Sequence, residues 1–275
     1  MKKRKIKEIK GVEMSTCLGL YIEENLIKYA KVSKDRDTFK VDAFGIRFFD
    51  NLNEAIKKIV EETYSFTTPI SINLANEQYL YYDIFALLSK NDIQKTVETE
   101  FETFCDENKY NQKAFETRYA LVSNVQNKER IKAIQVIVNK IELNKQKQYL
   151  EKHNLSGILP IGTAIASITR FEKKENVLIV NMEEKTTITT IYDRQIYNVE
   201  TIDHGSQEVL EKINRTENSM SKAYEICKGT TIYTANVIDD AKEQPHLEDI
   251  IPTLYQISQK IKEIVDESPV KISTV

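Results

Sequence analysis

The sequence predicts an α/β protein of two similar lobes, with a small α+β module inserted into the first lobe. The segment 18–32, LGLYIEENLIKYAKV, and the segment 178–192, LIVNMEEKTTITTIY, align with a constant offset of 160 (178 minus 18). Each begins a run of three β-rich segments followed by helices, and the stretch between the two runs has a different order of elements. The repeat therefore predicts two lobes built on one plan.

The composition is that of a globular chain. A length of 275 residues is enough for one large domain or two ordinary ones, and a hydrophobic content of 41% is enough for a sizeable core. Lys+Arg 39 against Asp+Glu 42 gives a formal net charge of -3, so no excess of positive charge indicates nucleic acid as a partner. The basic leader, residues 1–13, is expected to be disordered, with a nucleic-acid-binding or lipid-binding arm as the alternative.

The sequence favours a cytosolic location. No apolar run approaches the roughly 18 to 20 residues of a membrane helix, and no signal-peptide core follows the basic start. Cys17, Cys105 and Cys227 are widely spaced, so they are expected to be thiols in or near the core. No histidine has a partner at metal-ligand spacing, and no metal site is predicted.

The first lobe is expected to open with an antiparallel meander. Its strands are predicted at 17–22, 26–32 and 39–48, with polar turns between them. Apolar residues at helical spacing predict an amphipathic helix over 51–64, and the run PISINLA at 69–75 predicts a short buried strand that returns to the sheet.

A compact module then interrupts this lobe. Its expected order of strand, helix, strand, strand and helix corresponds to 79–87, 91–108, 115–123, 132–139 and 141–153. The chain returns through a strand at 155–161 and a helix rich in small residues at 162–171.

The second lobe repeats the meander and adds helices. Its main elements are expected, in chain order, at 176–182, 186–193, 195–203, 206–214, 217–229 and 249–265, with a short β-rich segment at 230–235. The final residues, PVKISTV, resemble the start of another strand, so we expect this lobe to be incomplete at its C-terminus.

These elements divide the chain into five parts. They are the leader 1–13, the first lobe at 14–76 and 154–175, the inserted module at 77–153, the second lobe at 176–205 and 247–275, and a small helical subdomain of the second lobe at 206–246.

Two such lobes, each with a strand-turn-strand tip at a shared cleft, have the actin-like, or ribonuclease-H-like, plan. Within it the chain resembles the PilM family of type IV pilus assembly proteins, which is related to FtsA and to the cytoplasmic domain of GspL. The resemblance spans residues 14–275 and depends on the order of four features: LGLYIEENLIK at 18–28, the inserted module, VNMEEKTT at 180–187 and DHGS at 203–206.

The resemblance implies that the two tips correspond to the phosphate loops of a site for ATP and magnesium. This chain departs from the family there: Tyr21 and Asn181 replace the metal-side aspartates, and Glu23 and Glu183 replace the tip glycines. The other tip positions implied by the resemblance are Glu24, Asn25, Lys28, Glu184, Thr186, Thr187 and Gly205.

Four carboxylates at these tips would repel a triphosphate. Like charges a few ångströms apart cost about 1 kcal/mol per pair in water and several in a cleft. The chain has only 7 glycines and lacks the usual glycine-rich phosphate-binding motifs. ATP and magnesium are expected of the family, but the sequence predicts that this chain has lost them and uses no cofactor.

The paired glutamates allow two other interpretations. Facing carboxylates can bind divalent cations or act as an acid/base pair. A Glu-Glu pair at a hairpin tip is more commonly solvated surface, and this interpretation is preferred for all four residues.

A tyrosine-rich strand leads into the inserted module. Proteins of the PilM family bind a short peptide of the inner-membrane protein PilN in a groove beside this module, and Tyr79, Tyr81, Tyr82 and Phe85 are candidates to line it. The alternative, to which we give more weight, is that these aromatic residues pack as core.

Together these features predict a cytosolic scaffold of type IV pilus assembly that is not an enzyme. It is expected to bind the N-terminal tail of a PilN-like protein, to couple it to the pilus assembly ATPase, and to reach the membrane only through its partners. One rival is an FtsA-like or PilM-like protein that still uses ATP. The other is an enzyme of the sugar-kinase superfold, which needs glycine-rich tips and a catalytic aspartate.

Overall fold

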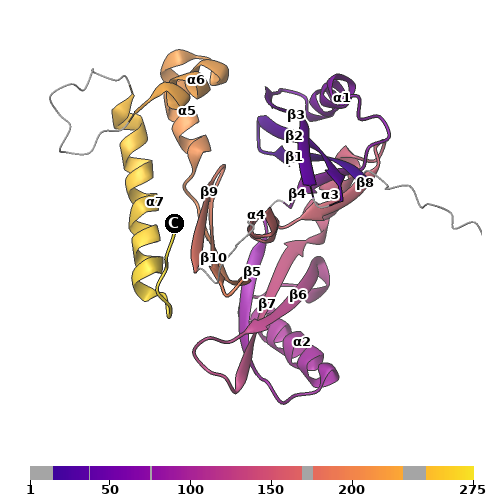
Figure 1. The fold of residues 1–275 in the computed structure, drawn as a ribbon, viewed down its shortest axis with the longest axis vertical. Coiled ribbons are helices and arrows are strands. Elements are labelled where there is room, and N and C mark those ends of the chain that lie inside the picture. The colour runs from indigo at the N-terminus through magenta and orange to yellow at the C-terminus, as the bar shows by residue number, and fades with distance from the viewer. Residues whose placement is uncertain (1–14, 37, 75, 169–175, 232–245) are drawn as a thin grey trace, which may run out of the picture. The chain divides into compact units, whose positions relative to one another are not determined.

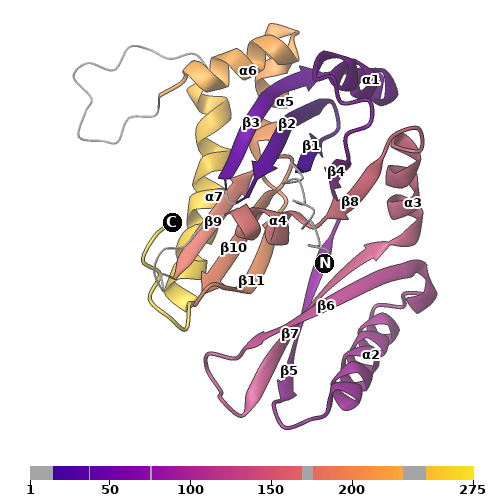
Figure 2. The same cartoon turned by 45° about the vertical axis from the view of Figure 1, so that its right-hand side comes forward.

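The computed structural model describes residues 15–36, 38–74, 76–168, 176–231 and 246–275, whose elements are labelled in Figure 1 and seen from a second side in Figure 2. The expected leader 1–13 and most of the segment 230–235 lie outside these ranges. The chain divides into two compact units, one made of Met1–Asn73 with Lys147–Ile158 and the other of Leu74–Gln146 with Leu159–Val275.

The first unit contains a five-stranded sheet in the order β3-β2-β1-β4-β8. The expected meander is present, because β1 (Ser15–Ile22), β2 (Leu26–Asp35) and β3 (Thr38–Phe48) are antiparallel neighbours. β4 (Ile70–Asn73) runs parallel to β1, and β8 (Leu155–Leu159) forms the edge opposite β3.

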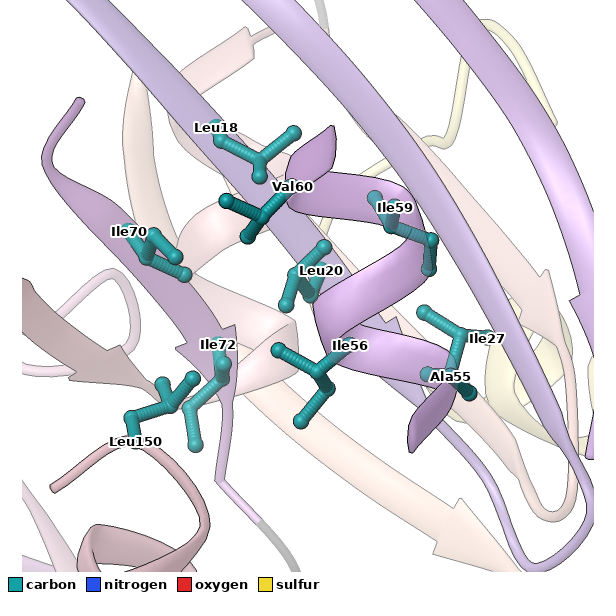
Figure 3. Packing of buried hydrophobic residues seen from close by; sticks show 10 residues of the cluster. All are labelled: Leu18, Leu20, Ile27, Ala55, Ile56, Ile59, Val60, Ile70, Ile72 and Leu150. Atoms are coloured by element: carbon teal, nitrogen blue, oxygen red, sulfur yellow. The ribbon is translucent and has the colours of Figure 1, made fainter. Parts of the chain in front are cut away.

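Helix α1 (Leu52–Glu62) covers one face of this sheet. The Asn51 side chain caps its N-terminus by accepting a backbone N–H at 3.1 Å. Ile56 of the helix is fully buried and belongs to one cluster with Leu18 and Leu20 of β1 (Figure 3). The helical period of 3.6 and the strand period of two thus bring two apolar faces together.

The inserted module is a three-stranded antiparallel sheet in the order β5-β7-β6, with helix α2 packed on one face. Val97 and Phe101 of α2 are among the buried residues of that face. The elements follow the expected order: β5 (Gln78–Phe85), α2 (Lys90–Glu107), the short 3-10 helix η1 (Gln112–Ala114), β6 (Phe115–Ser123), β7 (Arg130–Asn139) and α3 (Lys140–Tyr149).

The second meander forms a three-stranded sheet in the order β11-β10-β9. Ile264 of the last helix packs with Leu178 and Ile188 of this sheet. The elements are β9 (Val177–Met182), β10 (Thr186–Tyr192), β11 (Gln195–Ile202), α5 (Ser206–Glu217), α6 (Met220–Gly229) and α7 (Leu247–Glu267).

The end of the described chain lies beside β9. Leu178 N donates to the Thr274 carbonyl at 2.9 Å, and Thr274 forms an isolated parallel bridge with Val177. β4 lies beside β1 in the same parallel sense. Each unit therefore has a meander whose first strand has a parallel neighbour on its other side.

Helix α4 (Ile161–Ile168) packs on the second sheet. Thr189 of β10 donates its hydroxyl to the Gly162 carbonyl at 3.4 Å, and a Cβ at Gly162 would overlap Val199 of β11. The absence of a side chain at Gly162 lets α4 approach β11 closely. No described helix is long and apolar enough to cross a membrane.

Candidate functional site

The first tip is a three-residue turn between β1 and β2. Glu23 N donates to the Leu26 carbonyl at 2.9 Å and closes the turn. The Asn73 side chain bonds to both backbone groups of Ile22, the residue just before the tip. Its Oδ1 accepts from Ile22 N at 2.8 Å, and its Nδ2 donates to the Ile22 carbonyl at 3.1 Å. The sheet therefore fixes the backbone of this tip from both sides.

The expectation that Glu23 is solvated surface is wrong. The residue is 5% exposed, and its Oε1 lies 3.4 Å from the Lys28 ammonium. Burial raises the pKa of the Glu23 carboxyl, and the nearby Lys28 charge opposes this shift without overcoming it. Position alone did not reveal the burial, because the turn folds this side chain back along β2 toward Lys28.

The other two residues of the first tip differ in exposure. Glu24 is exposed, as expected, whereas Asn25 is half-buried. The Asn25 Oδ1 atom is buried and has no hydrogen-bond partner within the described chain. The first tip thus presents one solvated carboxylate and one buried carboxylate that is paired with a lysine.

The second tip is a three-residue turn between β9 and β10, and helix α5 begins against it. Glu183 N donates to the Lys185 carbonyl at 3.2 Å. The Glu183 carbonyl in turn accepts from Gln207 N at 3.3 Å and from the Ser206 hydroxyl at 3.2 Å. Backbone donors at the start of a helix are the groups that commonly bind phosphate. Here one of these donors, Gln207 N, already bonds to the Glu183 carbonyl of the tip.

Gly205 lets α5 approach this tip. It is the N-cap of α5, and a Cβ there would overlap the Glu183 carbonyl oxygen. Thr186, fully buried, donates its hydroxyl to the His204 carbonyl at 2.6 Å. Thr187 is also buried, and the Asn181 Nδ2 atom is buried without a hydrogen-bond partner among the described residues.

The charged groups around the second tip are paired with each other. Lys185 lies 2.6 Å from Asp203, and this hydrogen bond lowers the pKa of the Asp203 carboxyl. Glu208 lies 2.7 Å from Lys212 and 2.8 Å from His204, which lower its pKa in that order. Glu183 is half-buried, whereas Glu184 is exposed, as expected.

Neither tip has the backbone of a glycine-rich phosphate loop. All residues of both turns have negative φ, so they form without the left-handed conformations that glycine supplies. No group of three metal-ligating side chains occurs within the described residues. The tips belong to different units, so each is a separate feature of its own sheet.

The tyrosine-rich strand β5 does not present its aromatic residues on one surface. Tyr79, Tyr81 and Phe85 alternate on one face, whereas Tyr82 points to the α2 face and packs beside Ile84. Phe85 is 56% exposed, and the Arg130 guanidinium lies 4.6 Å from its ring centroid. Within this set, Phe85 is the aromatic side chain most open to solvent.

Tyr81 attaches the inserted module to the edge of the second sheet. Its hydroxyl donates to the Val199 carbonyl at 2.6 Å and accepts from Val199 N at 2.7 Å. The Lys132 ammonium lies 4.6 Å from the Tyr81 ring centroid and 4.0 Å from that of Tyr197. Burial lowers the pKa of Lys132.

The sequence did not indicate the role of Glu77, which caps the start of α4. Its carboxylate accepts from Ile161 N, at the start of α4, at 2.9 and 3.0 Å, and it accepts the Tyr79 hydroxyl at 2.5 Å. Burial raises the pKa of this carboxyl, against the effect of these hydrogen bonds. Helix α4 begins at Ile161 directly after a proline, which has no side chain that could cap the helix. Glu77 supplies this cap from 84 residues earlier in the chain, so no local pattern indicated its role.

Comparison with known proteins identifies the fold. No protein-family model matches the chain, and no curated protein sequence matches it. A chain of the PilM–PilN type IV pilus biogenesis complex matches with a TM-score of 0.66 and 14% identity, over 91% of this chain and 76% of that chain.

Two looser matches have TM-scores of 0.48. The cytoplasmic domain of EpsL, from the type II secretion system of Vibrio cholerae, is 12% identical over 90% of this chain and 95% of that one. The ethanolamine utilization protein EutJ from Carboxydothermus hydrogenoformans is 9% identical over 96% and 76%. The expected actin-like fold class is confirmed, and the chain shares its fold with a component of the PilM–PilN complex.

Proposed function

We propose that this chain is a non-catalytic, actin-like scaffold of type IV pilus assembly or of a related secretion system. It binds the N-terminal tail of a PilN-like inner-membrane protein and couples that protein to the assembly ATPase. It stays on the cytosolic side and reaches the membrane through its partners. The observation that carries this proposal is the fold shared with a chain of the PilM–PilN complex.

The geometry of the two tips supports a scaffold that has lost its nucleotide site. Glu23 places a carboxylate where a phosphate loop needs a backbone donor, and Lys28, the cation of that tip, is already paired with it at 3.4 Å. At the second tip, the Gln207 N–H at the start of α5 is used by the Glu183 carbonyl. A triphosphate at the first tip would have to break the pair of Glu23 and Lys28 and face the exposed charge of Glu24. A triphosphate at the second tip would have to displace the Glu183 carbonyl from the Gln207 N–H and face the exposed charge of Glu184.

Calorimetric titration with ATP and magnesium tests this part of the proposal. We expect no heat of binding up to about 1 mM nucleotide, which corresponds to less than about 4 kcal/mol of binding free energy. Binding at or below that concentration that is lost in Lys28→Ala would contradict it. Filaments that sediment only with ATP would instead favour the FtsA-like rival, and phosphoryl transfer to a sugar would favour the kinase rival.

We place the peptide-binding surface on the inserted module, at Phe85, the C-terminal residue of β5. The Tyr79 and Tyr81 hydroxyls bond to Glu77 and Val199, so these two side chains help to hold the module in place. Phe85 is exposed and lies 4.6 Å from the Arg130 guanidinium, and exposed aromatic side chains with such a neighbour suit an anchor at a binding surface.

Fluorescence anisotropy with a labelled N-terminal peptide of a candidate PilN-like partner tests this surface. Phe85→Ala should weaken binding about tenfold, because losing an aromatic anchor costs about 1–2 kcal/mol. Tyr119→Ala is the matched control, since Tyr119 is 41% exposed on the edge strand β6 and faces the α2 side. An equal loss in both variants, or no binding by the wild-type chain at high micromolar concentration, would contradict the proposed peptide site.

A further inference from the structure

Strand β3 carries the largest group of exposed apolar side chains on any described strand. Phe44 is 80% exposed, Phe39 58%, Val41 56% and Ile46 39%. These residues do not contribute to the core of the first unit. Apolar patches of this kind on a soluble protein commonly mark a binding surface.

The four side chains lie on one face of the sheet. Directly paired residues of antiparallel strands share a face, and Phe44 pairs with Ala30 while Ile46 pairs with Lys28. Gly45, between them, faces the other way, because a Cβ there would overlap the Tyr29 ring, which packs on the α1 core. We call this surface, opposite α1 and centred on β3, the open face.

The edge of β3 is guarded against the addition of another strand. The pairing with β2 shifts at Lys31 and Val32, so Asp42 has no partner in the register and forms a bulge. The Lys40 ammonium lies 3.2 Å from this Asp42 carboxylate. A bulge and a charged pair in the middle of an edge strand oppose strand-to-strand pairing. The open face, and not the edge, is therefore the accessible binding surface.

Lys34 supplies a positive charge on the open face. Lys34 pairs directly with Phe39, and its ammonium lies 5.4 Å from the Phe39 ring centroid. Lys28 lies on the same face beside Ile46, but its ammonium is paired with the Glu23 carboxylate at 3.4 Å. A ligand for this surface therefore needs apolar side chains for β3 and a carboxylate for Lys34.

We propose that the open face binds an acidic amphipathic helix of a partner protein. A helix packed across β2 and β3 would cover these apolar side chains as α1 covers the opposite face. Its apolar stripe meets Phe44 and Ile46, and its glutamates or aspartates meet Lys34. The basic leader of this chain has the wrong charge for that role. This site is independent of the proposed peptide surface at Phe85, which belongs to the other unit.

Fluorescence anisotropy with two synthetic helical peptides tests the proposal. One has leucines on one face and glutamates on the other, and the second has lysines in place of the glutamates. The acidic peptide should bind the full chain with a Kd in the micromolar range, and the basic peptide at least tenfold more weakly. Phe44→Ser and Lys34→Glu should each weaken the acidic peptide about tenfold. Lys34→Glu should also improve binding of the basic peptide.

The matched control is Tyr255→Ser, which removes a residue that is 62% exposed on α7 of the other unit. Its binding should be unchanged, and all variants should keep the circular dichroism spectrum of the wild type. The proposal is overturned if the acidic peptide does not bind below about 1 mM, if both peptides bind equally, or if Phe44→Ser has no effect. Self-association that Phe44→Ser abolishes in analytical ultracentrifugation would assign the face to a second copy of the chain instead.

Discussion

Glu23 combines deep burial with a charge that is only partly balanced. Its side chain is 2% exposed, and the side chain of Lys28, its counter-ion at 3.4 Å, is 31% exposed. Desolvation disfavours the ionised form more than Lys28 stabilises it, so the pKa of Glu23 is raised. The folded state therefore holds the Glu23 proton more tightly than the unfolded chain does.

This raised pKa predicts how Glu23 changes stability with pH. Its contribution to folding is complete below the unfolded pKa, near 4.5, and is lost as pH rises through the raised folded value. Glu23→Gln should therefore be more stable than the wild type at pH 7, by about 1 kcal/mol, and the difference should shrink below the unfolded pKa. Thermal unfolding of both proteins across this pH range measures it.

Lys28→Met serves as the companion variant. Removing one partner of a fully buried ion pair costs about 3–5 kcal/mol, and the partial exposure of Lys28 reduces this to about 1–2 kcal/mol at pH 7. Its unfolding temperature should fall, in the opposite direction to that of Glu23→Gln. A stability gain in Lys28→Met, or a Glu23→Gln difference that grows toward low pH, would show that the carboxyl is not desolvated as described.

The sequence located this residue but not its environment. The aligned repeat placed Glu23 and Glu183 at equivalent turns, and both turns are present. Which glutamate is buried depends on the side chains that surround each turn. In the first unit Lys28 pairs with Glu23, whereas in the second unit the nearby Lys185 pairs with Asp203. Such choices are tertiary, so the spacing of residues along the chain does not encode them directly.

At the scale of elements, the contact between α5 and the second tip depends on one glycine. Gly205 has φ −162° and is extended, so its backbone conformation is open to any residue. The absence of a side chain is what matters, because a Cβ would overlap the Glu183 carbonyl. The resemblance singled out this glycine as part of a turn, and the structure gives it a steric role.

Gly205→Ala should destabilise the second unit by about 2–4 kcal/mol, because backbone atoms must move apart to admit the methyl group. Gly229→Ala is the control, since Gly229 ends α6 and a Cβ there has no neighbour within 4 Å. That change should be neutral, or stabilising by up to about 1 kcal/mol. Denaturant unfolding of the two variants compares them, and equal midpoints would contradict the close approach of α5 to the tip.

The periodicity of the sequence predicts most strands and helices, but it does not predict which elements contact one another. The expected helix over 91–108 is α2, and the expected strand at 115–123 coincides with β6. The four aromatic residues of β5 were expected to act together, and the alternation of the strand places Tyr82 on the opposite face from Tyr79 and Tyr81. The partner of Tyr81, however, lies 118 residues further along the chain, and no local pattern indicates such a long-range contact.

At the scale of the whole molecule, the inserted module belongs to the same compact unit as the second sheet. The contacts that join them include Tyr81 with Val199, Lys132 with the Tyr197 ring, and Ser123 N with the Gln195 side chain at 3.0 Å. All three meet β11, the edge strand of that sheet. The module thus covers an edge that would otherwise be open to pairing with another strand.

Tyr81→Phe tests this attachment, because it removes one hydroxyl and keeps the ring over which Lys132 lies. Val199 is 3% exposed, so its N–H and carbonyl would lose their partner without gaining full solvation. The variant should be less stable by about 1–2 kcal/mol. Hydrogen exchange at Val199 should accelerate about tenfold if the edge opens locally. Tyr119→Phe, on the edge strand β6, should change neither quantity. If Val199 exchanges at the wild-type rate in Tyr81→Phe, the module is held on β11 by its other contacts and the tyrosine hydroxyl is dispensable.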